Sequence, residues 1–265
     1  MTTRRNFILS AASVFTTLNS SNLVTAMTTP TAALDPRTIF AMSAISPKDG
    51  LRMLNEMLKL TKRARPKLLI IPTAIGDDPK WIAWWRKLPP EVLNCELDFL
   101  TTFGDSTDMK EFHPLITNTD AIFVMGGNTL SALAVWRAHG IDKSLRAAWE
   151  KGVVLGGESA GMVCWFEQGL SDSRPEKLSV VDGLGFLPES CCPHYEDKND
   201  RRKTYQSMVG SGALAAGYGC ESGTALVFSG TELREAITTD AALTVNRLTK
   251  VQSGVDVARI ATRLI

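Results

Sequence analysis

The stretch Gly152–Gly161 has the sequence GVVLGGESAG. Its apolar part, Val153–Leu155, is typical of a short buried strand, and Met162–Phe166, which follows the stretch, suits a buried helix. The glycines on either side of Ser159 let the chain turn sharply from strand into helix without a Cβ clash. The stretch therefore predicts a strand–turn–helix unit, the repeating element of an α/β fold.

The chain before this unit alternates between apolar runs and amphipathic segments. We expect strands at residues 38–42, 67–72, 96–101 and 121–125 and helices at residues 51–62, 78–88, 129–139 and 143–151. Continuous apolar runs that are each followed by a helix indicate a mostly parallel sheet, flanked by helices on both faces.

Two short runs beyond the unit, 225–228 and 231–237, predict a C-terminal β-hairpin, and residues 255–265 could add an edge strand. No repeat or linker divides the chain. We therefore expect a single α/β domain over residues 34–265.

The overall composition excludes two classes of partner. Hydrophobic residues make up 44% and charged residues 22%, as in soluble proteins with a sizeable core. The 29 basic and 28 acidic residues give a net charge of +1. With this balance the protein has no net positive field that would attract nucleic acid, and the sequence has no polybasic patch that would bind a membrane.

Residues 1–33 resemble an export signal. The pair Arg4-Arg5 precedes a mildly apolar stretch, Phe7–Leu18, and Val24–Ala26 supplies small residues suited to cleavage. This order is similar to a twin-arginine leader, and the stretch is too short and polar to span a bilayer. We expect export to the periplasm or the medium; the alternative is a disordered polar tail on a cytoplasmic protein.

The cysteines and histidines do not indicate a metal site. The five cysteines are odd in number and form no C-x-x-C pair, and the three histidines do not cluster at ligand spacing. We expect buried, idle thiols and no structural metal.

Ser159 is the candidate nucleophile. Gly157–Gly161 fits the pattern G-x-S-x-G, in which a strained turn exposes the serine at the end of a strand. The following helix would point free N–H groups, that of Ala160 among them, at a developing oxyanion. The alternative is a tight turn whose small residues merely allow close packing.

A second loop after an expected strand, Gly126–Thr129, has the sequence GGNT. In parallel sheets such loops gather at the same edge, so Gly127 is a candidate second oxyanion donor and Asn128 a candidate substrate contact. The alternative is an ordinary loop in which Asn128 or Thr129 caps the next helix.

A serine nucleophile needs a base and a group that orients the base. His139 ends an expected helix and His113 lies in a turn far upstream, whereas His194 follows Ser159 at the end of an apolar stretch. We therefore expect His194 to be the base. For the acid, Asp172 and Glu221 are equally suitable, and each could instead be a solvated loop carboxylate.

Four motifs in this order resemble the peptidase E (aspartyl dipeptidase) and cyanophycinase family: Met125–Thr129, Gly157–Gly161, Trp165–Gly169 and Pro193–Tyr195. The resemblance runs from about residue 38 to residue 237. It implies a Rossmann-like sheet akin to class I glutamine amidotransferases. It also implies a cofactor-free serine peptidase whose substrate is a small peptide, in the best-known members a dipeptide that begins with aspartate.

The resemblance also assigns residues. It implies Ser159 as nucleophile, His194 as base and either Asp172 or Glu221 as acid. The resemblance places a family arginine that holds the substrate's acidic side chain near Arg201. This role fits the chemistry, since guanidinium binds carboxylate in a bidentate manner. The alternative for Arg201 is a solvent-facing helix residue.

Three other functions remain as alternatives. An α/β-hydrolase esterase normally carries its histidine later in the chain than His194, and a glutamine amidotransferase needs cysteine at position 159. A non-catalytic relative that only binds a small acidic ligand would need the same residues in misaligned positions. The sequence does not indicate an oligomeric state.

Overall fold

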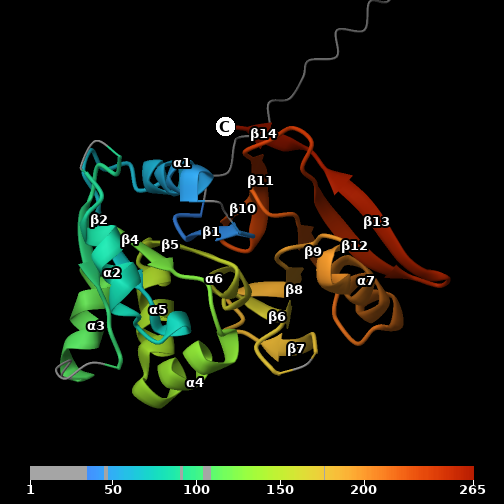
Figure 1. Cartoon of the computed structure of the whole chain (residues 1–265), viewed down its shortest axis with the longest axis horizontal. Helices are drawn as coiled ribbons and strands as arrows, with labels where there is room; N and C mark the ends of the chain where they lie inside the picture. The colour runs from blue at the N-terminus through green and yellow to red at the C-terminus, as the bar shows by residue number, and fades with distance from the viewer. Residues whose placement is uncertain (1–34, 45–46, 90–91, 104–108, 176) are drawn as a thin grey trace, which may run out of the picture. The chain divides into compact units, whose positions relative to one another are not determined.

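The computed structural model describes residues 35–44, 47–89, 92–103, 109–175 and 177–265 (Figure 1). All of them belong to one compact unit, Leu34–Ile265. The predicted leader, residues 1–33, lies outside the described residues. Within the described ranges, no helix has the length and apolar character needed to cross a bilayer.

The larger of two sheets has eight strands in the order β14-β11-β10-β1-β5-β4-β2-β3. The five strands from β1 to β3 in this order run parallel, as the continuous apolar runs predict. The strands are β1 (Thr38–Met42), β2 (Lys67–Ile71), β3 (Glu96–Phe99), β4 (Ala121–Val124), β5 (Val154–Glu158), β10 (Thr224–Ser229), β11 (Glu232–Thr238) and β14 (Thr262–Leu264).

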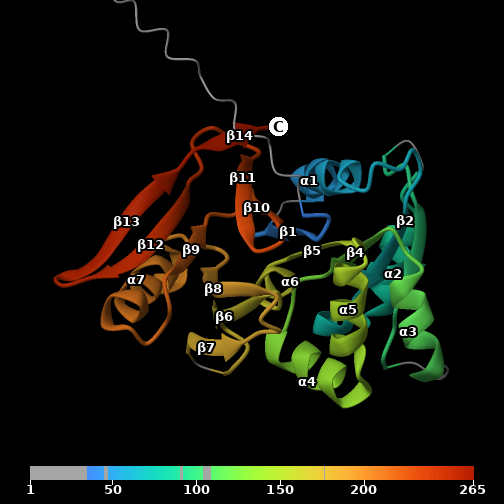
Figure 2. The same cartoon turned by 180° about the vertical axis from the view of Figure 1, so that it is seen from behind.

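Helices cover both faces of this sheet (Figures 1 and 2). They are α1 (Pro47–Lys59), the short η1 (Thr73–Ile75), α2 (Pro79–Arg86), α3 (Met109–Thr117), α4 (Thr129–His139) and α5 (Ile141–Glu150). Successive side chains of a strand point to opposite faces. On β1, Phe40 therefore packs into the cluster under α1 and α2, and Ile39 into the cluster with α3, α4 and α5.

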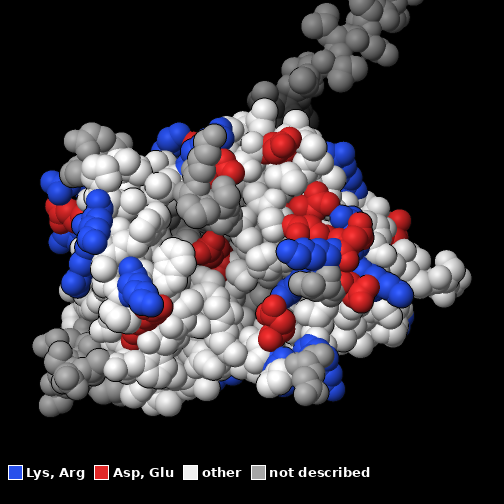
Figure 3. All heavy atoms as spheres, viewed as in Figure 1, with Lys and Arg blue, Asp and Glu red and all other residues white. Residues whose placement is uncertain are grey.

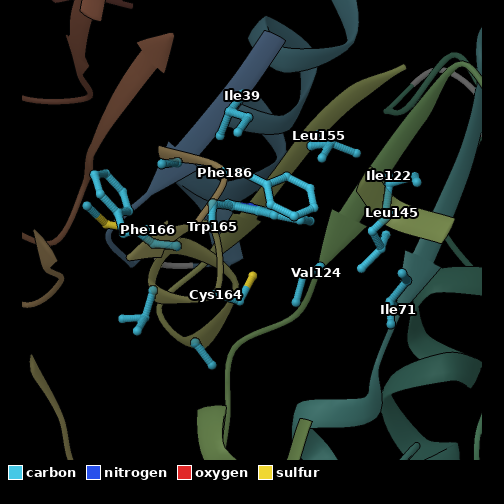
Figure 4. Packing of buried hydrophobic residues seen from close by; sticks show 14 of the residues in the cluster. Ile39, Ile71, Ile122, Val124, Leu145, Leu155, Cys164, Trp165, Phe166 and Phe186 are labelled. Atoms are coloured by element: carbon cyan, nitrogen blue, oxygen red, sulfur yellow. The ribbon is translucent and has the colours of Figure 1, made fainter. Parts of the chain in front are cut away.

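The second of these clusters is the main core (Figure 4). Leu155 in the central strand β5 is fully buried there and pairs with Ile39 of β1 and Ile122 of β4. Trp165 and Phe186 close the cluster, with ring centroids 5.6 Å apart.

The predicted C-terminal hairpin is confirmed. Strands β10 and β11 are antiparallel and join through Gly230, and β10 also runs antiparallel to β1. The hairpin thereby extends the parallel sheet on the β1 side.

A second sheet was not predicted. Its strand order is β13-β12-β9-β8-β6-β7, and Figure 1 shows it in yellow to red beside the first sheet. One face is covered by α7 (Arg201–Ser211), which follows the short helix η2 (Lys198–Asp200). The strands are β6 (Phe166–Ser171), β7 (Ser179–Asp182), β8 (Leu187–Cys192), β9 (Gly217–Cys220), β12 (Val245–Val251) and β13 (Gly254–Ile260).

The prediction of a helix over Met162–Phe166 is wrong in its bounds. The helix α6 spans only Ala160–Val163, and Phe166 already begins β6. The carbonyls that follow α6 accept hydrogen bonds from the loop before β8 instead of from a further helical turn: Leu184 N donates to Cys164 O and Phe186 N to Trp165 O, each at 2.8 Å. A short apolar run does not distinguish helix from strand by periodicity.

We expect Leu155→Ala to lower the free energy of unfolding by about 2–5 kcal/mol, because it leaves a cavity in the centre of the larger sheet. The control is Val257→Ala on β13, where the side chain is 39% exposed; its effect should stay within about 0.5 kcal/mol. Urea unfolding of both variants measures the difference. Equal midpoints would show that Leu155 does not lie in the main core.

Candidate functional site

Ser159 stands at a strained turn between β5 and α6. Its backbone angles are φ 53° and ψ −105°, a region that a non-glycine residue adopts only where the surroundings impose it. Its N–H donates to Met42 O at 3.1 Å and to Ser43 O at 2.8 Å. A Cβ at Gly161 would lie 2.2 Å from Val124 O, so this side of the turn requires glycine.

The His194 ring faces this serine. The distance from His194 Nε2 to Ser159 Oγ is 2.9 Å. His194 follows β8 and also has a positive φ, 53°. The two side chains thus come from different sheets and meet where strands β5 and β8 end. Their roles as nucleophile and base stay a prediction.

Ser43, the residue after β1, fixes both partners. Besides accepting from Ser159 N, it binds His194: His194 N donates to Ser43 Oγ at 2.8 Å, and Ser43 Oγ donates to Cys220 O at 2.8 Å. Its side chain is fully buried. Sequence reasoning missed this role; the only signal is a small hydroxyl residue at the carboxyl end of the first strand.

The environment keeps His194 neutral. Burial, and then the positive charge of Arg201, lower the pKa of His194 below its ordinary value of 6.5, while Glu196 and Asp172 oppose the shift. A neutral imidazole can accept the proton of Ser159.

The other nitrogen of His194 faces Ser222. His194 Nδ1 lies 3.4 Å from Ser222 Oγ, and Ser222 N donates to Glu196 Oε1 at 2.8 Å. Burial acts to raise the pKa of Glu196, but hydrogen bonds from Ser222 and the positive charge of Lys198 act against it, and the pKa is lowered. Sequence reasoning missed Glu196, although it lies only two residues after His194.

The two acids predicted from the sequence bind arginines in the structure. Asp172 Oδ2 lies 2.7 Å from Arg201 Nη2. Glu221 Oε1 accepts from Arg202 Nη2 at 2.7 Å, and its Oε2 accepts from Thr244 N at 2.6 Å. A catalytic role for either carboxylate stays a prediction.

Arg201 is buried, contrary to the solvent-facing alternative. The residue is 6% exposed and begins α7. Its side chain lines a cavity of about 320 Å³, whose other walls are Asp172, His194, Glu196, Lys198 and Ser222. The predicted base and the predicted carboxylate-binding residue therefore share one cavity. Figure 3 shows acidic and basic side chains gathered over the region of β9, β12 and α7.

The predicted oxyanion donors lie on two sides of Ser159. Ala160 is the first residue of α6. A Cβ at Gly126 would lie 3.4 Å from Ser159 Cβ, so the loop that contains Gly127 runs directly beside the serine. At Gly127, φ is 134° and a Cβ would lie 2.3 Å from Ala74 O. Donation to an oxyanion by either residue stays a prediction.

Asn128 caps α4, as the capping alternative expects. Its side chain accepts from Ser131 N at 2.9 Å and donates to Ser173 O at 3.0 Å. Both ends of the amide are therefore engaged within the protein, and a contact with substrate stays a prediction.

Glu158, directly before Ser159, is a further titratable group that sequence reasoning missed. Burial raises its pKa to about 7, although a hydrogen bond from the Gly126 N–H acts against the shift. The carboxyl group therefore titrates near neutral pH beside the loop of Gly127.

The other two histidines make their contacts outside this site. His113 Nδ1 lies 2.9 Å from Ser144 Oγ, and the His139 ring packs edge-on against Phe112. All five cysteines are free and buried. Among the described residues, no group of three or more His, Cys, Asp or Glu side chains could hold a metal ion.

Comparisons with known proteins identify the family of this chain. The model of peptidase family S51 matches residues 39–236. The chain is 37% identical over 190 residues to the uncharacterized peptidase YgaJ of Bacillus subtilis (strain 168), which covers 71% of this chain and 80% of that relative.

Two solved structures share the fold. A peptidase from an acI-B1 Actinobacterium superimposes with a TM-score of 0.63 at 19% identity, over 83% of this chain and 94% of that one. A putative peptidase E protein from Listeria monocytogenes EGD-e gives a TM-score of 0.57 at 22% identity, over 77% and 99%. With a family match over most of its length, this chain belongs to peptidase family S51 and is a peptidase.

Proposed function

We propose that this serine-type peptidase cleaves short peptides, dipeptides with an N-terminal aspartate among them, with Ser159 as nucleophile and His194 as base. The observation that carries the proposal is the 2.9 Å contact between Ser159 Oγ and His194 Nε2. The contact lies beside the cavity that Arg201 lines.

The reaction follows from this contact. His194 Nε2 takes the proton of Ser159 while Oγ attacks the peptide carbonyl, and the N–H groups of Ala160 and Gly127 bind the oxyanion. The imidazolium then gives the proton to the leaving amine. Water hydrolyses the acyl-enzyme with His194 again as base.

We assign the orientation of the base to Glu196, acting through Ser222. For Nε2 to accept a proton, Nδ1 must carry one, and Nδ1 faces Ser222 Oγ. The Glu196 carboxylate binds Ser222 and adds a negative charge that stabilises the imidazolium.

The cavity supports the choice of a short, acidic substrate. A volume of about 320 Å³ suits a small ligand. Arg201 is the buried cation in its wall, and guanidinium binds an aspartyl carboxylate in a bidentate manner.

We expect Ser159→Ala to lower turnover of Asp-Leu by at least about 1,000-fold with no loss of secondary structure, because the attacking oxygen is removed. Asp-Leu, Glu-Leu, Ala-Leu and isoaspartyl-Leu form the test panel, and a fluorophosphonate probe reports the activated hydroxyl. The exposed Ser211→Ala serves as control. A folded Ser159→Ala variant with full activity would exclude Ser159 as nucleophile.

We expect kcat/KM to rise with pH below 6.5 and to fall above about 7. The rise reflects loss of the proton from His194, whose lowered pKa lies below 6.5. The fall reflects ionisation of Glu158, with its pKa of about 7, because a negative charge beside Gly127 disfavours the oxyanion. In Glu158→Gln the rise should remain and the fall should disappear; an unchanged profile would contradict the assignment.

We expect Glu196→Gln to lower kcat by about tenfold, less than the ~10⁴-fold loss for an acid that contacts the base directly. Glu221→Gln is the matched comparison, because Glu221 binds Arg202 and Thr244 instead. Steady-state kinetics with Asp-Leu measure both variants. A larger loss of kcat in Glu221→Gln would favour Glu221 as the acid.

A further inference from the structure

The ion pair between Arg201 and Asp172 is unequally buried. The Arg201 side chain is 8% exposed and the Asp172 side chain 71% exposed, although the atoms Nη2 and Oδ2 lie 2.7 Å apart. The cation is thus fixed in the wall of the cavity, while its partner stands largely in water on the loop after β6.

Separation of this ion pair would destabilise Arg201 and Asp172 to different extents. A buried guanidinium without a carboxylate is strongly destabilised, whereas an exposed carboxylate that leaves it is at once solvated. Burial acts to raise the pKa of Asp172, but the charge and hydrogen bond of Arg201 outweigh it and lower that pKa, so the group is ionised at neutral pH.

The cavity contains no excess of positive charge among its lining residues. Asp172 and Glu196 face Lys198 and Arg201 in the same wall. An incoming carboxylate therefore meets an arginine that already has a partner, and it competes with that partner for the guanidinium.

We propose that Asp172 is a tethered competitor of the substrate: its carboxylate occupies Arg201 in the free enzyme and is exchanged for the aspartyl side chain of an incoming peptide. The inference rests on the proposed function, in which Arg201 binds that side chain. The displaced and the displacing group are chemically the same, so the exchange conserves the ion pair of Arg201.

The exchange makes Asp172 a determinant of specificity. A neutral side chain cannot replace the carboxylate, because Arg201 would then lose its counter-ion. An acidic side chain of the substrate can replace it, but the free energy needed to displace Asp172 lowers the net affinity for the substrate. Removing Asp172 should therefore strengthen the binding of acidic ligands and leave neutral ones unaffected.

A neighbouring pair supplies a matched control. Asp197 Oδ1 lies 2.9 Å from Arg202 Nε, and the Asp197 side chain is 89% exposed. Asp197→Asn removes the same charge from the adjacent arginine, which does not line the cavity. Comparison of Asp172→Asn with Asp197→Asn therefore distinguishes an exchange at Arg201 from a general effect of removing one negative charge.

The test is calorimetric titration of the whole chain with free aspartate and with asparagine, in wild type, Asp172→Asn and Asp197→Asn. We expect aspartate to bind Asp172→Asn at least about fivefold more tightly than wild type, because the ion pair that Asp172 forms with Arg201 no longer opposes binding. Asp197→Asn should match wild type, and asparagine should bind all three proteins equally. KM for Asp-Leu should fall with KM for Ala-Leu unchanged.

The inference is wrong if Asp172→Asn binds aspartate no more tightly than wild type, if both variants shift equally, or if none of the three binds aspartate. It is also wrong if kcat for Asp-Leu and Ala-Leu falls together with KM unchanged, since Asp172 would then act in catalysis. If none of the three proteins cleaves a dipeptide but aspartate still binds Asp172→Asn more tightly than wild type, the proposed function is wrong and the exchange at Arg201 is supported.

Discussion

The hydrogen bonds of Ser43 are the constraint on which the site depends. Through its carbonyl Ser43 accepts the N–H of Ser159, and through its hydroxyl it accepts the N–H of His194 and binds Cys220 O. The nucleophile belongs to the larger sheet and the base to the smaller one. One buried residue at the end of β1 therefore sets, through its carbonyl and its hydroxyl, the separation of two groups that must meet within hydrogen-bond distance.

Electrostatic effects at the site follow from partial burial rather than from an excess of one charge. Burial keeps His194 neutral and raises the pKa of Glu158, while Arg201 adds a positive charge that lowers the pKa of His194 further. Arg201 thus affects two groups of the cavity at once: it acts on the base through its charge and on Asp172 through a direct ion pair. A site of this kind responds to any change in the partner of Arg201.

Much of the architecture could be predicted from the sequence, because the buried parallel strands leave continuous apolar runs and the elbow at Ser159 needs glycines at fixed positions. The smaller sheet could not, since its strands are short, and β6 begins inside an apolar run that also suits a helix. The contact of His194 with Ser159 follows from chain order and strand ends. Ser43 and Glu196 escaped because their roles depend on contacts between segments distant in the sequence, such as Ser43 with Cys220 and Glu196 with Ser222.

All five thiols are buried, which shields them from solvent oxidants. Burial raises the pKa of Cys95 to about 11 and of Cys192 to about 12, so the reactive thiolate is scarcely populated at neutral pH. Oxidants and disulfides in the surroundings therefore find no nucleophilic sulfur to attack while the chain is folded. Burial therefore shields the cysteines of the folded chain from oxidation in a reducing and in an oxidising compartment alike.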